Sequence, residues 1–570
     1  MLRVLAFSLL VFIPALGLSC QEERIEPADL VLLNGKVVTL NPENPEGGAI
    51  AVSDGTVLAV GTTDQIQGLV GNQTRVIDLE GRLVTPGFIE SHAHLSGIGE
   101  AHLSLDLSHA HSWDEIVELV ARTAAKARRG DWIIGHGWHQ EKWDSAPSPS
   151  LQGFPLHEAL SRATPDNPVL LTHASGHACI ANQRAMDLAG IDPGTKDPEG
   201  GRILRDASGR PTGVFEEAAQ GLIHKAYARA LAQRSPEEAA AHRRRIVELA
   251  TRECLSKGIC SFHDAGTTVE YLETLKEMAA DGSLPIRLYC MLREPNERLA
   301  GKMASLKMIG FGNDHLTVRA IKRYADGALG SRGAWLLEPY ADLPSSVGLP
   351  ADEFDELRDT AELAAQNGFQ LCTHAIGDRA NREVLDVYEA TAARYPSVAT
   401  GRWRIEHAQH LSLQDIPRFN ALGVIAAMQA IHATSDGPWV VDRLGEERAR
   451  TGAYVWRSLL DSGAVISNGT DAPVEDVDPI PCFYAAVTRR TKQGDAFFPE
   501  QCMTRLEALR SYTLAGAYAA FEEERKGSLA PGKLADLTVF SQDLLTVPDD
   551  QILQTQVDYT IVGGQVLYER

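Results

Sequence analysis

The sequence predicts an α/β protein whose main part is a closed (β/α)8 barrel of the TIM type. Two observations support this. Short apolar runs alternate with helical stretches through most of the chain, which favours parallel strands joined by crossover helices. Eight of the runs can be counted as strands, and several end in polar side chains, as expected where a barrel gathers the C-terminal ends of its strands at one face.

The spacing of the predicted strands is uneven. The eight runs end near His92, His263, Met291, Lys322, His374, His407, Met428 and Asp471. Helical stretches separate most of them, for example Pro236–Lys257, Asp352–Asn367 and Asp378–Arg394. Roughly 165 residues lie between the first two strands, far more than one crossover helix needs. We therefore expect residues from about 100 to 230 to form an insertion after the first barrel strand, lying over the mouth of the barrel.

Both ends of the chain are expected to contribute strands to one small β-sandwich domain. The strand-like regions are Asp29–Val38, Ala49–Val60, Leu534–Phe540 and Val557–Tyr568. Three of them are predicted to be hairpins, which turn at Asn34-Gly35, Asp54-Gly55 and Gly563-Gly564. The predicted organisation is thus a composite β domain of residues 21–85 and 525–570, and a barrel of residues 86–524.

The first twenty residues have the features of a secretory signal. Arg3 precedes an almost entirely apolar run, Val4–Leu18, which is too short to span a bilayer comfortably. The segment Leu16–Cys20 resembles a bacterial lipoprotein processing site, although Gly17 stands where that pattern favours Leu. Cys20 would then become the lipidated first residue. The alternatives are cleavage and release without a lipid, or a buried N-terminal helix. We expect an exported protein of the cell envelope, periplasmic or membrane-anchored, with secretion as the alternative.

Charge and cysteine content narrow the possible partners. The formal net charge of −22 argues against a nucleic-acid partner, because phosphate binding needs basic patches and none is visible. Membrane contact is expected only through a lipid on Cys20. The other seven cysteines form an odd set without a close-spaced metal pattern, and several lie in apolar runs, which predicts buried thiols.

Histidines and an aspartate stand where four predicted strands end. His92 and His94 are separated by one residue in an extended segment, so both imidazoles project the same way and can hold one cation. His374, His407 and Asp471 end three further strands. Each alone has an ordinary explanation, such as a packed core histidine or a helix-capping aspartate. Together on one rim they predict a metal site. Lys322 ends another strand, where spacing alone favours a salt-bridge partner.

This set of motifs resembles the amidohydrolase superfamily, specifically amidohydrolase family 3, the branch that contains N-substituted formamide deformylases. The resemblance runs from about Asp29 to the C-terminus. Its motifs are Pro86–His94, Gly176-His177-Ala178, Ile321–Arg332, Thr373–Asp378, Ile405–His410, Gly469–Pro473 and Lys526–Asp536.

The resemblance implies a metal centre of two divalent ions. Lys322 would react with carbon dioxide, and the carbamate would bridge the two ions with anionic oxygens where an ammonium would repel them. His92, His94 and Asp471 would hold one ion, and His374 and His407 the other. Zinc suits these ligands, and manganese, iron, nickel and a single-ion site stay open as alternatives.

The resemblance also implies a hydrolase that acts on small molecules with an amide, formamide or cyclic-amide bond. A metal-activated hydroxide would attack the carbonyl, and Asp471 would take its proton and pass it to the leaving nitrogen. His177 is expected either to donate a hydrogen bond to the developing oxyanion or to have a structural role. The alternatives are a hydrolase or isomerase acting on another bond type, and an exported ligand-binding protein without turnover.

Three residues are candidates for substrate binding. Trp138 is expected either to line the substrate pocket or to be a buried structural tryptophan. Asp326 and Arg332 follow Lys322 and are expected either to contact the substrate or to brace their loop.

Overall fold

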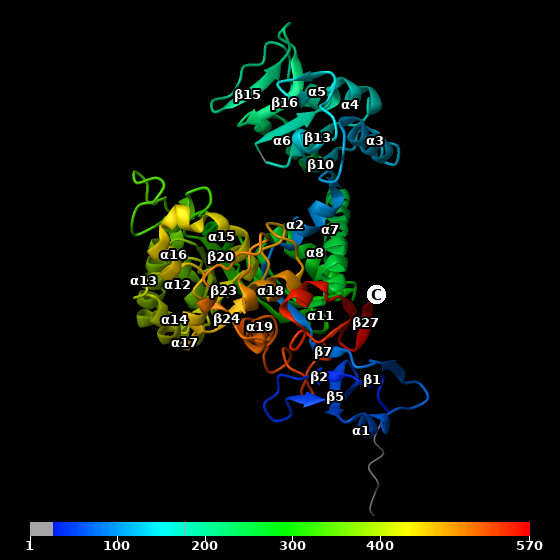
Figure 1. Cartoon of the computed structure of the whole chain (residues 1–570), viewed down its shortest axis with the longest axis vertical. Coiled ribbons are helices and arrows are strands. Elements are labelled where there is room, and N and C mark those ends of the chain that lie inside the picture. The colour runs from blue at the N-terminus through cyan, green and yellow to red at the C-terminus, as the bar shows by residue number, and fades with distance from the viewer. Residues whose placement is uncertain (1–26, 176) are drawn as a thin grey trace, which may run out of the picture.

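The computed structural model describes residues 27–175 and 177–570. The expected signal and Cys20 lie outside the described residues. Figure 1 shows three parts: a central barrel, a β domain to which both ends of the chain contribute, and an insertion on the far side of the barrel from that domain.

Eight parallel strands form the barrel, which confirms the predicted fold class. They lie in the order β24-β23-β22-β21-β20-β18-β17-β8, and β19 (Met308–Gly310) pairs with β20 at the side. The barrel strands are β8 (Phe88–Ala93), β17 (Ile259–Thr267), β18 (Arg287–Leu292), β20 (Leu316–Tyr324), β21 (Gln370–Ala375), β22 (Arg404–His407), β23 (Ile425–Met428) and β24 (Ile466–Asn468). The first and last strands meet through two hydrogen bonds: the Asp471 amide donates to the His92 carbonyl and the His94 amide to the Ala472 carbonyl, both at 2.8 Å.

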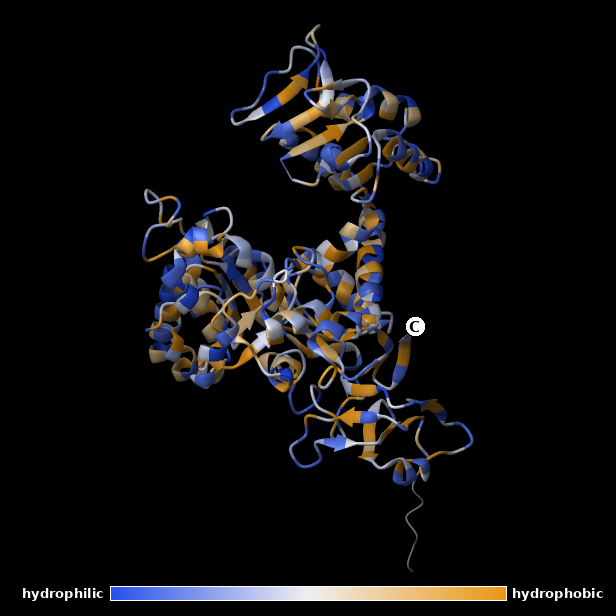
Figure 2. Ribbon diagram, in the orientation of Figure 1, coloured by the Kyte–Doolittle hydropathy of each residue, from blue (hydrophilic) through white to orange (hydrophobic). Residues whose placement is uncertain are grey.

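Helices cover the outside of the barrel. They are α8 (Val269–Ala280), α9 (Asn296–Leu299), α10 (Met303–Leu306), α11 (Phe311–Asp314), α12 (Leu357–Asn367), α13 (Asp378–Arg394), α14 (Ile416–Leu422), α15 (Ala430–Leu444), α16 (Glu446–Gly452), α17 (Trp456–Asp461), α18 (Pro479–Thr488), α19 (Arg505–Ser511) and α20 (Leu514–Ala519). Polar and apolar residues alternate along them (Figure 2), as expected for helices with one face on a core. Every residue of β8, β18 and β21 is buried, as is usual in a parallel sheet covered by helices.

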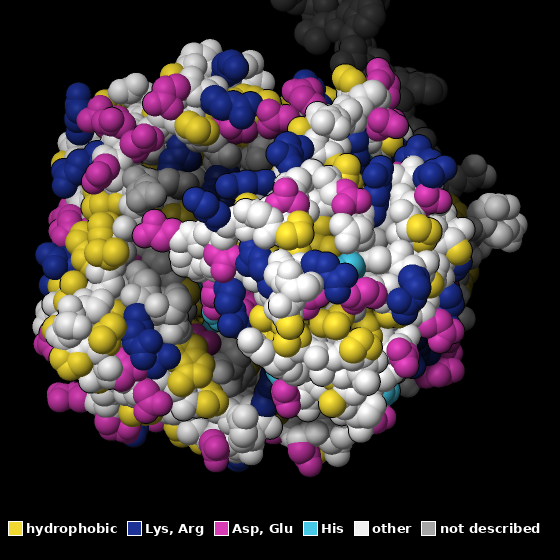
Figure 3. Space-filling model, turned by 90° about the horizontal axis from the view of Figure 1, so that it is seen from above, with side chains coloured by type: hydrophobic (Ala, Val, Ile, Leu, Met, Phe, Trp, Pro, Cys, Tyr) yellow, Lys and Arg dark blue, Asp and Glu magenta, His cyan; other side chains and the backbone are white. Residues whose placement is uncertain are grey.

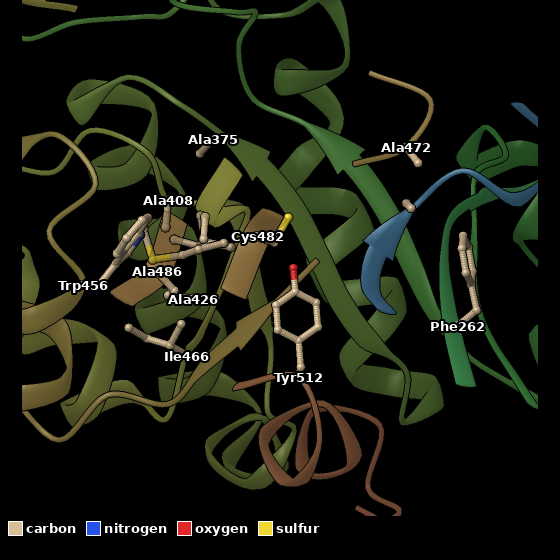
Figure 4. Packing of buried hydrophobic residues seen from close by; sticks show 14 of the residues in the cluster. Phe262, Ala375, Ala408, Ala426, Trp456, Ile466, Ala472, Cys482, Ala486 and Tyr512 are labelled. Atoms are coloured by element: carbon tan, nitrogen blue, oxygen red, sulfur yellow. The ribbon is translucent and has the colours of Figure 1, made fainter. Parts of the chain in front are cut away.

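The core under the last barrel strand supports the loop that follows it. In Figure 4 the Tyr512 hydroxyl points toward Cys482. This hydroxyl donates a hydrogen bond to the Gly469 carbonyl at 3.2 Å. The backbone that leads into Asp471 therefore rests on a packed aromatic side chain.

Two sheets form the β domain. One has the order β5-β4-β1-β6 and the other β27-β26-β25-β7-β2-β3. Their strands are β1 (Leu30–Leu33), β2 (Lys36–Val38), β3 (Glu46–Gly47), β4 (Ala49–Ser53), β5 (Thr56–Gly61), β6 (Arg75–Asp78), β7 (Leu83–Pro86), β25 (Leu537–Phe540), β26 (Val557–Val562) and β27 (Gln565–Glu569), with α1 (Thr63–Gln67) beside them. Strand β25 from the C-terminal end pairs antiparallel with β7 from the N-terminal end.

Two of the three predicted hairpins are confirmed and one is wrong. The turns at Asp54-Gly55 and Gly563-Gly564 join antiparallel partners. At Asn34-Gly35, however, the chain crosses from one sheet to the other, because β1 pairs with β4 and β6 whereas β2 pairs with β3 and β7. A Cβ atom on Gly35 would lie 2.3 Å from Leu79 Cδ1. Close approach between the sheets, rather than a hairpin turn, therefore requires this glycine.

The insertion is a separate α/β unit with its own core. Its main sheet has the order β15-β16-β14-β13-β10-β9. Its elements are β9 (Leu105–Asp106), α3 (Trp113–Ala124), β10 (Ile133–Trp138), β11 (Ser150–Leu151), β12 (Phe154–Pro155), α4 (Glu158–Ala163), β13 (Val169–His173), β14 (Ala178–Ala181), α5 (Gln183–Ala189), β15 (Gly201–Arg205), β16 (Pro211–Glu217) and α6 (Gln220–Ala232).

The position of the insertion differs from the expectation. In Figure 1 it stands beyond the ends of α2 (Leu95–Leu103) and α7 (Pro236–Ser256), clear of the barrel mouth. Helix α2 starts directly after the rim residue His94 and packs along α7. With 21 residues, α7 is about 30 Å long. The two helices form a stalk that carries the insertion away from the rim.

The surface and the thiols add two observations. Charged side chains of both signs are interspersed over the face shown in Figure 3. Six of the seven described cysteines are buried and Cys502 is half-buried, all as free thiols. In the part of the chain that the structure describes, no helix has both the length and the apolar character needed to cross a membrane.

Candidate metal centre

Six side chains with metal-binding chemistry line one cavity of about 430 Å³ at the C-terminal ends of the barrel strands. They are the residues expected as ligands from the sequence: His92, His94, Lys322, His374, His407 and Asp471. They come from β8, β20, β21 and β22 and from the loop after β24. Side chains from five segments that are distant in the sequence therefore line the same cavity.

The donor atoms of these side chains lie close together. One ligand atom each from His92, His407 and Asp471 lies within 4.8 Å of the other two. Asp471 Oδ1 is 3.2 Å from His94 Nε2 and 3.5 Å from His92 Nε2. The His374 ring centroid is 4.5 Å from that of His407. His407 therefore lies between the group of His92, His94 and Asp471 and the imidazole of His374.

Three nitrogen atoms of the expected ligands are buried without a hydrogen-bond partner in the described chain: His92 Nε2, Lys322 Nζ and His374 Nε2. The Lys322 side chain is fully buried. Buried polar groups without partners are costly, and an unpaired ammonium is the most costly of them. Divalent cations between the imidazoles, with a carbamate in place of the ammonium, would satisfy all three atoms. The residues present thus fit a metal centre of the expected kind.

A buried ion pair orients His92. Its Nδ1 contacts Glu406, whose carboxylate also accepts a hydrogen bond from Arg404 at 2.9 Å. Burial acts to raise the pKa of Glu406, but Arg404 and His92 outweigh it and lower that pKa to about 2. An ionised carboxylate at Nδ1 favours the tautomer with its proton there, which leaves Nε2 free to bind a cation.

A neutral side chain orients His407 in the same way. Its Nδ1 lies 2.6 Å from Oε1 of Gln429. Burial, and next the charge of His374, hold the pKa of His407 well below its usual value. The neutral imidazole therefore donates from Nδ1 to Gln429 and keeps Nε2 for the cavity.

Strained backbone surrounds Asp471 and His407. Their φ angles are +61° and +74°, in the left-handed region that residues other than glycine rarely adopt. Just before Asp471, a Cβ atom on Gly469 would lie 2.3 Å from Glu90 Oε1 and 2.6 Å from the His92 amide nitrogen. Only glycine allows the chain to pass this close to β8, and this passage places Asp471 beside His92.

Other residues that line the cavity were not identified from the sequence; they include Tyr324, His432, Asp436, Trp439 and Glu475. His432 Nε2 is 3.9 Å from Asp471 Oδ2 and has no hydrogen-bond partner within the described chain. The sequence feature that could have indicated His432 is its position four residues after the end of β23.

Two residues expected near the substrate lie in the insertion. His177 is exposed, and its Nδ1 is 3.0 Å from Glu217 Oε1 in a separate cavity of about 410 Å³. Trp138 is fully buried in the insertion core, and its indole nitrogen donates to the Leu171 carbonyl at 3.0 Å. This geometry corresponds to the second alternative for Trp138, a buried structural tryptophan, because a ring with no exposed surface cannot line a substrate pocket.

The other two candidates for substrate binding brace their loop. Both carboxylate oxygens of buried Asp326 accept backbone hydrogen bonds, from Ile376, Gly377 and Trp335. Arg332 pairs with Asp342 at 2.8 Å and is absent from the cavity lining. Their hydrogen-bonding groups are taken up by the protein, which corrects the expectation of substrate contact in favour of the bracing alternative.

Comparisons with known proteins point to one family. The sequence matches the amidohydrolase family over residues 75–568. It is 32% identical to YtcJ of Bacillus subtilis over 552 residues, 94% of this chain and 98% of that protein. It is 30% identical to the N-substituted formamide deformylase of Arthrobacter pascens over 556 residues, 95% and 98% of the two chains. The crystal structure of an uncharacterized metal-dependent hydrolase from Pyrococcus horikoshii matches with a TM-score of 0.73 and 27% identity, over 91% of this chain and 99% of that one.

The contact between His407 and Gln429 can be tested without leaving a buried charge. Gln429→Met keeps the side-chain length but removes the acceptor at His407 Nδ1. We expect zinc affinity to fall by about 10- to 100-fold, as when other partners of metal-binding histidines are removed. Competition with a chelating dye measures it. Gln67→Met, on exposed α1, is the control. Equal zinc affinity in the two variants would show that Gln429 does not support the site.

Proposed function

Since this chain belongs to the amidohydrolase family and is a hydrolase, we propose that it cleaves a carbon–nitrogen bond of an amide, formamide or cyclic amide with the help of divalent metal ions. One observation carries the proposal: six side chains with metal-binding chemistry line one cavity, and three of their nitrogen atoms are buried without partners. The name of the Arthrobacter relative, a formamide deformylase, supports the choice of bond.

In this proposal the residues divide into two groups of ligands. His92, His94 and Asp471 would hold one ion, His374 and His407 would hold a second, and Lys322 as a carbamate would supply anionic oxygens to both. Zinc is the ion that imidazole and carboxylate ligands suit best. When bound, the ions supply hydroxide near neutral pH and polarise the substrate carbonyl.

Asp471 is positioned to move the proton. Its Oδ1 faces His92 and His94, whereas Oδ2 lies 3.9 Å from His432 Nε2. Burial acts to raise the pKa of Asp471, but a hydrogen bond from His94 and the nearby His92 outweigh it and hold that pKa far below its usual value. An ionised Oδ2 can accept the proton of the attacking water and pass it to the leaving nitrogen, which must be protonated before the bond breaks.

A hydrolysis screen tests the reaction. We expect protein without residues 1–20 to hydrolyse members of a panel of N-formyl, N-acyl and cyclic amides, and to lose this activity in a strong chelator. Asp471→Asn keeps the size of the side chain but removes the base, so turnover should fall by about 10²- to 10⁴-fold. Asp442→Asn, exposed on α15, is the control. Near-normal turnover in Asp471→Asn would contradict the assignment of Asp471, and activity on esters alone would contradict the choice of bond.

Metal loading tests the role of Lys322. We expect apoprotein in buffer free of carbon dioxide to take up more zinc per chain after bicarbonate is added, because the carbamate then forms. Lys322→Met should lose this response, and Lys322→Glu, which supplies a carboxylate, should not need bicarbonate. Elemental analysis measures the zinc, and Lys302→Met, on the surface, is the control. If bicarbonate has no effect on the unaltered chain, Lys322 binds no metal as a carbamate.

We also propose that the chain is exported and anchored by a lipid, as its first twenty residues indicate. Mass spectrometry of the N-terminus from the native host should find diacylated Cys20. A free terminus near Cys20 would replace the lipid anchor with simple secretion, and an intact Met1 would exclude both.

A further inference from the structure

A second set of side chains lines the metal cavity without belonging to the expected ligands. Ser435, Asp436 and Trp439 come from α15, and Val474 and Glu475 come from the loop after β24. Asp436 and Trp439 are three residues apart on a helix and therefore share a face. Asp436 and Glu475 line the same cavity as the expected ligands, so a substrate bound there can meet both.

Among the described residues, neither carboxylate has a lysine or arginine partner, and the base beside Asp436 is His432. Asp436 Oδ2 accepts hydrogen bonds from the Tyr454 hydroxyl at 2.5 Å and from Gln409 Nε2 at 3.3 Å, both of which are neutral donors. Burial raises the pKa of Asp436 and the charge of Glu475 adds to that rise, although the Tyr454 hydrogen bond and His432 oppose it. In the described ranges, the ion pairs that we find include no lysine or arginine bound to Asp436 or Glu475. Two carboxylates therefore share the cavity without a lysine or arginine beside them.

Two buried carboxylates of this chain, by contrast, are paired with arginine. Glu406 pairs with Arg404 at 2.7 Å and Asp536 with Arg287 at 2.8 Å. A buried carboxylate without such a partner carries a desolvation cost that a cation can remove. Among the cavity-lining residues the one lysine or arginine is Lys322, which belongs to the metal ligands. The missing positive charge would therefore come from the ligand.

We propose that this cavity selects substrates that carry a cationic group, which Asp436 and Glu475 bind while the ring of Trp439 covers its apolar part. Trp439 can take this place because Gly330 has no side chain: a Cβ atom there would lie 3.3 Å from the ring. Arg443 lies 5.6 Å from the Trp439 ring centroid but is already paired with Asp342. The inference rests on the proposed function and adds the substrate class: an amide with a pendant ammonium, amidinium or guanidinium group.

The cavity volume fits this class. About 430 Å³ accommodates a small molecule with a scissile amide at one end and a charged group at the other. The carbonyl would lie at the ligand end, where the unpartnered nitrogen atoms are, and the cation beside α15. An amide with a pendant carboxylate would meet two like charges and be rejected.

Matched substrates test the charge preference. Three N-formyl amides of equal length would end in an ammonium, a hydroxyl or a carboxylate group. We expect kcat/KM to be at least about tenfold higher for the ammonium than for the hydroxyl compound, and lowest for the carboxylate. In the double variant Asp436→Asn, Glu475→Gln the ratio should fall toward one, mainly through KM of the ammonium compound. Asp442→Asn, on the exposed side of α15, should keep the ratio of the unaltered chain.

A binding experiment separates this inference from the proposed reaction. Calorimetry with benzylammonium and benzyl alcohol on the zinc-loaded chain needs no turnover. Stronger binding of benzylammonium that is lost in the double variant supports the cation subsite even where no amide is cleaved. Amide hydrolysis with equal use of the ammonium and hydroxyl compounds, or equal binding of the two probes, overturns the subsite and leaves the proposed reaction standing.

Discussion

The burial of three unpartnered nitrogen atoms at one barrel rim is the constraint on which the rest of the site depends. Lys322 Nζ, His92 Nε2 and His374 Nε2 are buried at the lining of the cavity without a hydrogen-bond partner in the described chain. Because buried polar groups without partners are costly, a bound partner that supplies the missing interaction stabilises the folded protein. The simplest partner is a cation. The contacts of Glu406 with His92 and of Gln429 with His407 orient the imidazoles toward the same cavity.

The contacts that hold the ligands also close the barrel. The Asp471 amide donates to the His92 carbonyl, so the backbone that joins the last strand to the first carries two ligands at once. Arg404 extends this connection inward, because it binds both Glu406 behind His92 and the Ser91 carbonyl at 2.6 Å. Gly469 makes the approach possible by leaving room for Glu90. Ligand geometry and barrel closure are therefore one structural property, and the strained backbone at Asp471 is maintained by the whole barrel.

The sequence predicted those features that depend on chain periodicity. A buried parallel strand is a short apolar run, and the first polar residue after it stands at the rim, so His92, His374 and His407 could be placed without coordinates. His432 and Asp436 could not, since they lie on a helix and periodicity does not say which face of that helix meets the cavity. The position of the insertion could not be predicted because it depends on how α2 packs along α7. The prediction of a hairpin at Asn34-Gly35 was wrong because a crossing between two sheets uses the same residue types.

The outer wall of the cavity and its ligands form one rigid unit. Gln409 follows His407 by two residues and donates to Asp436, while its carbonyl accepts a hydrogen bond from the Tyr454 amide at 2.7 Å. The Tyr454 hydroxyl in turn donates to Asp436. The segment that presents a ligand at one end of the cavity thus fixes a carboxylate at the other. Sites whose contacting groups are held this way need little rearrangement on binding. For a substrate with a carbonyl at one end and a cation at the other, this rigidity sets both the orientation and the distance between the two recognised groups.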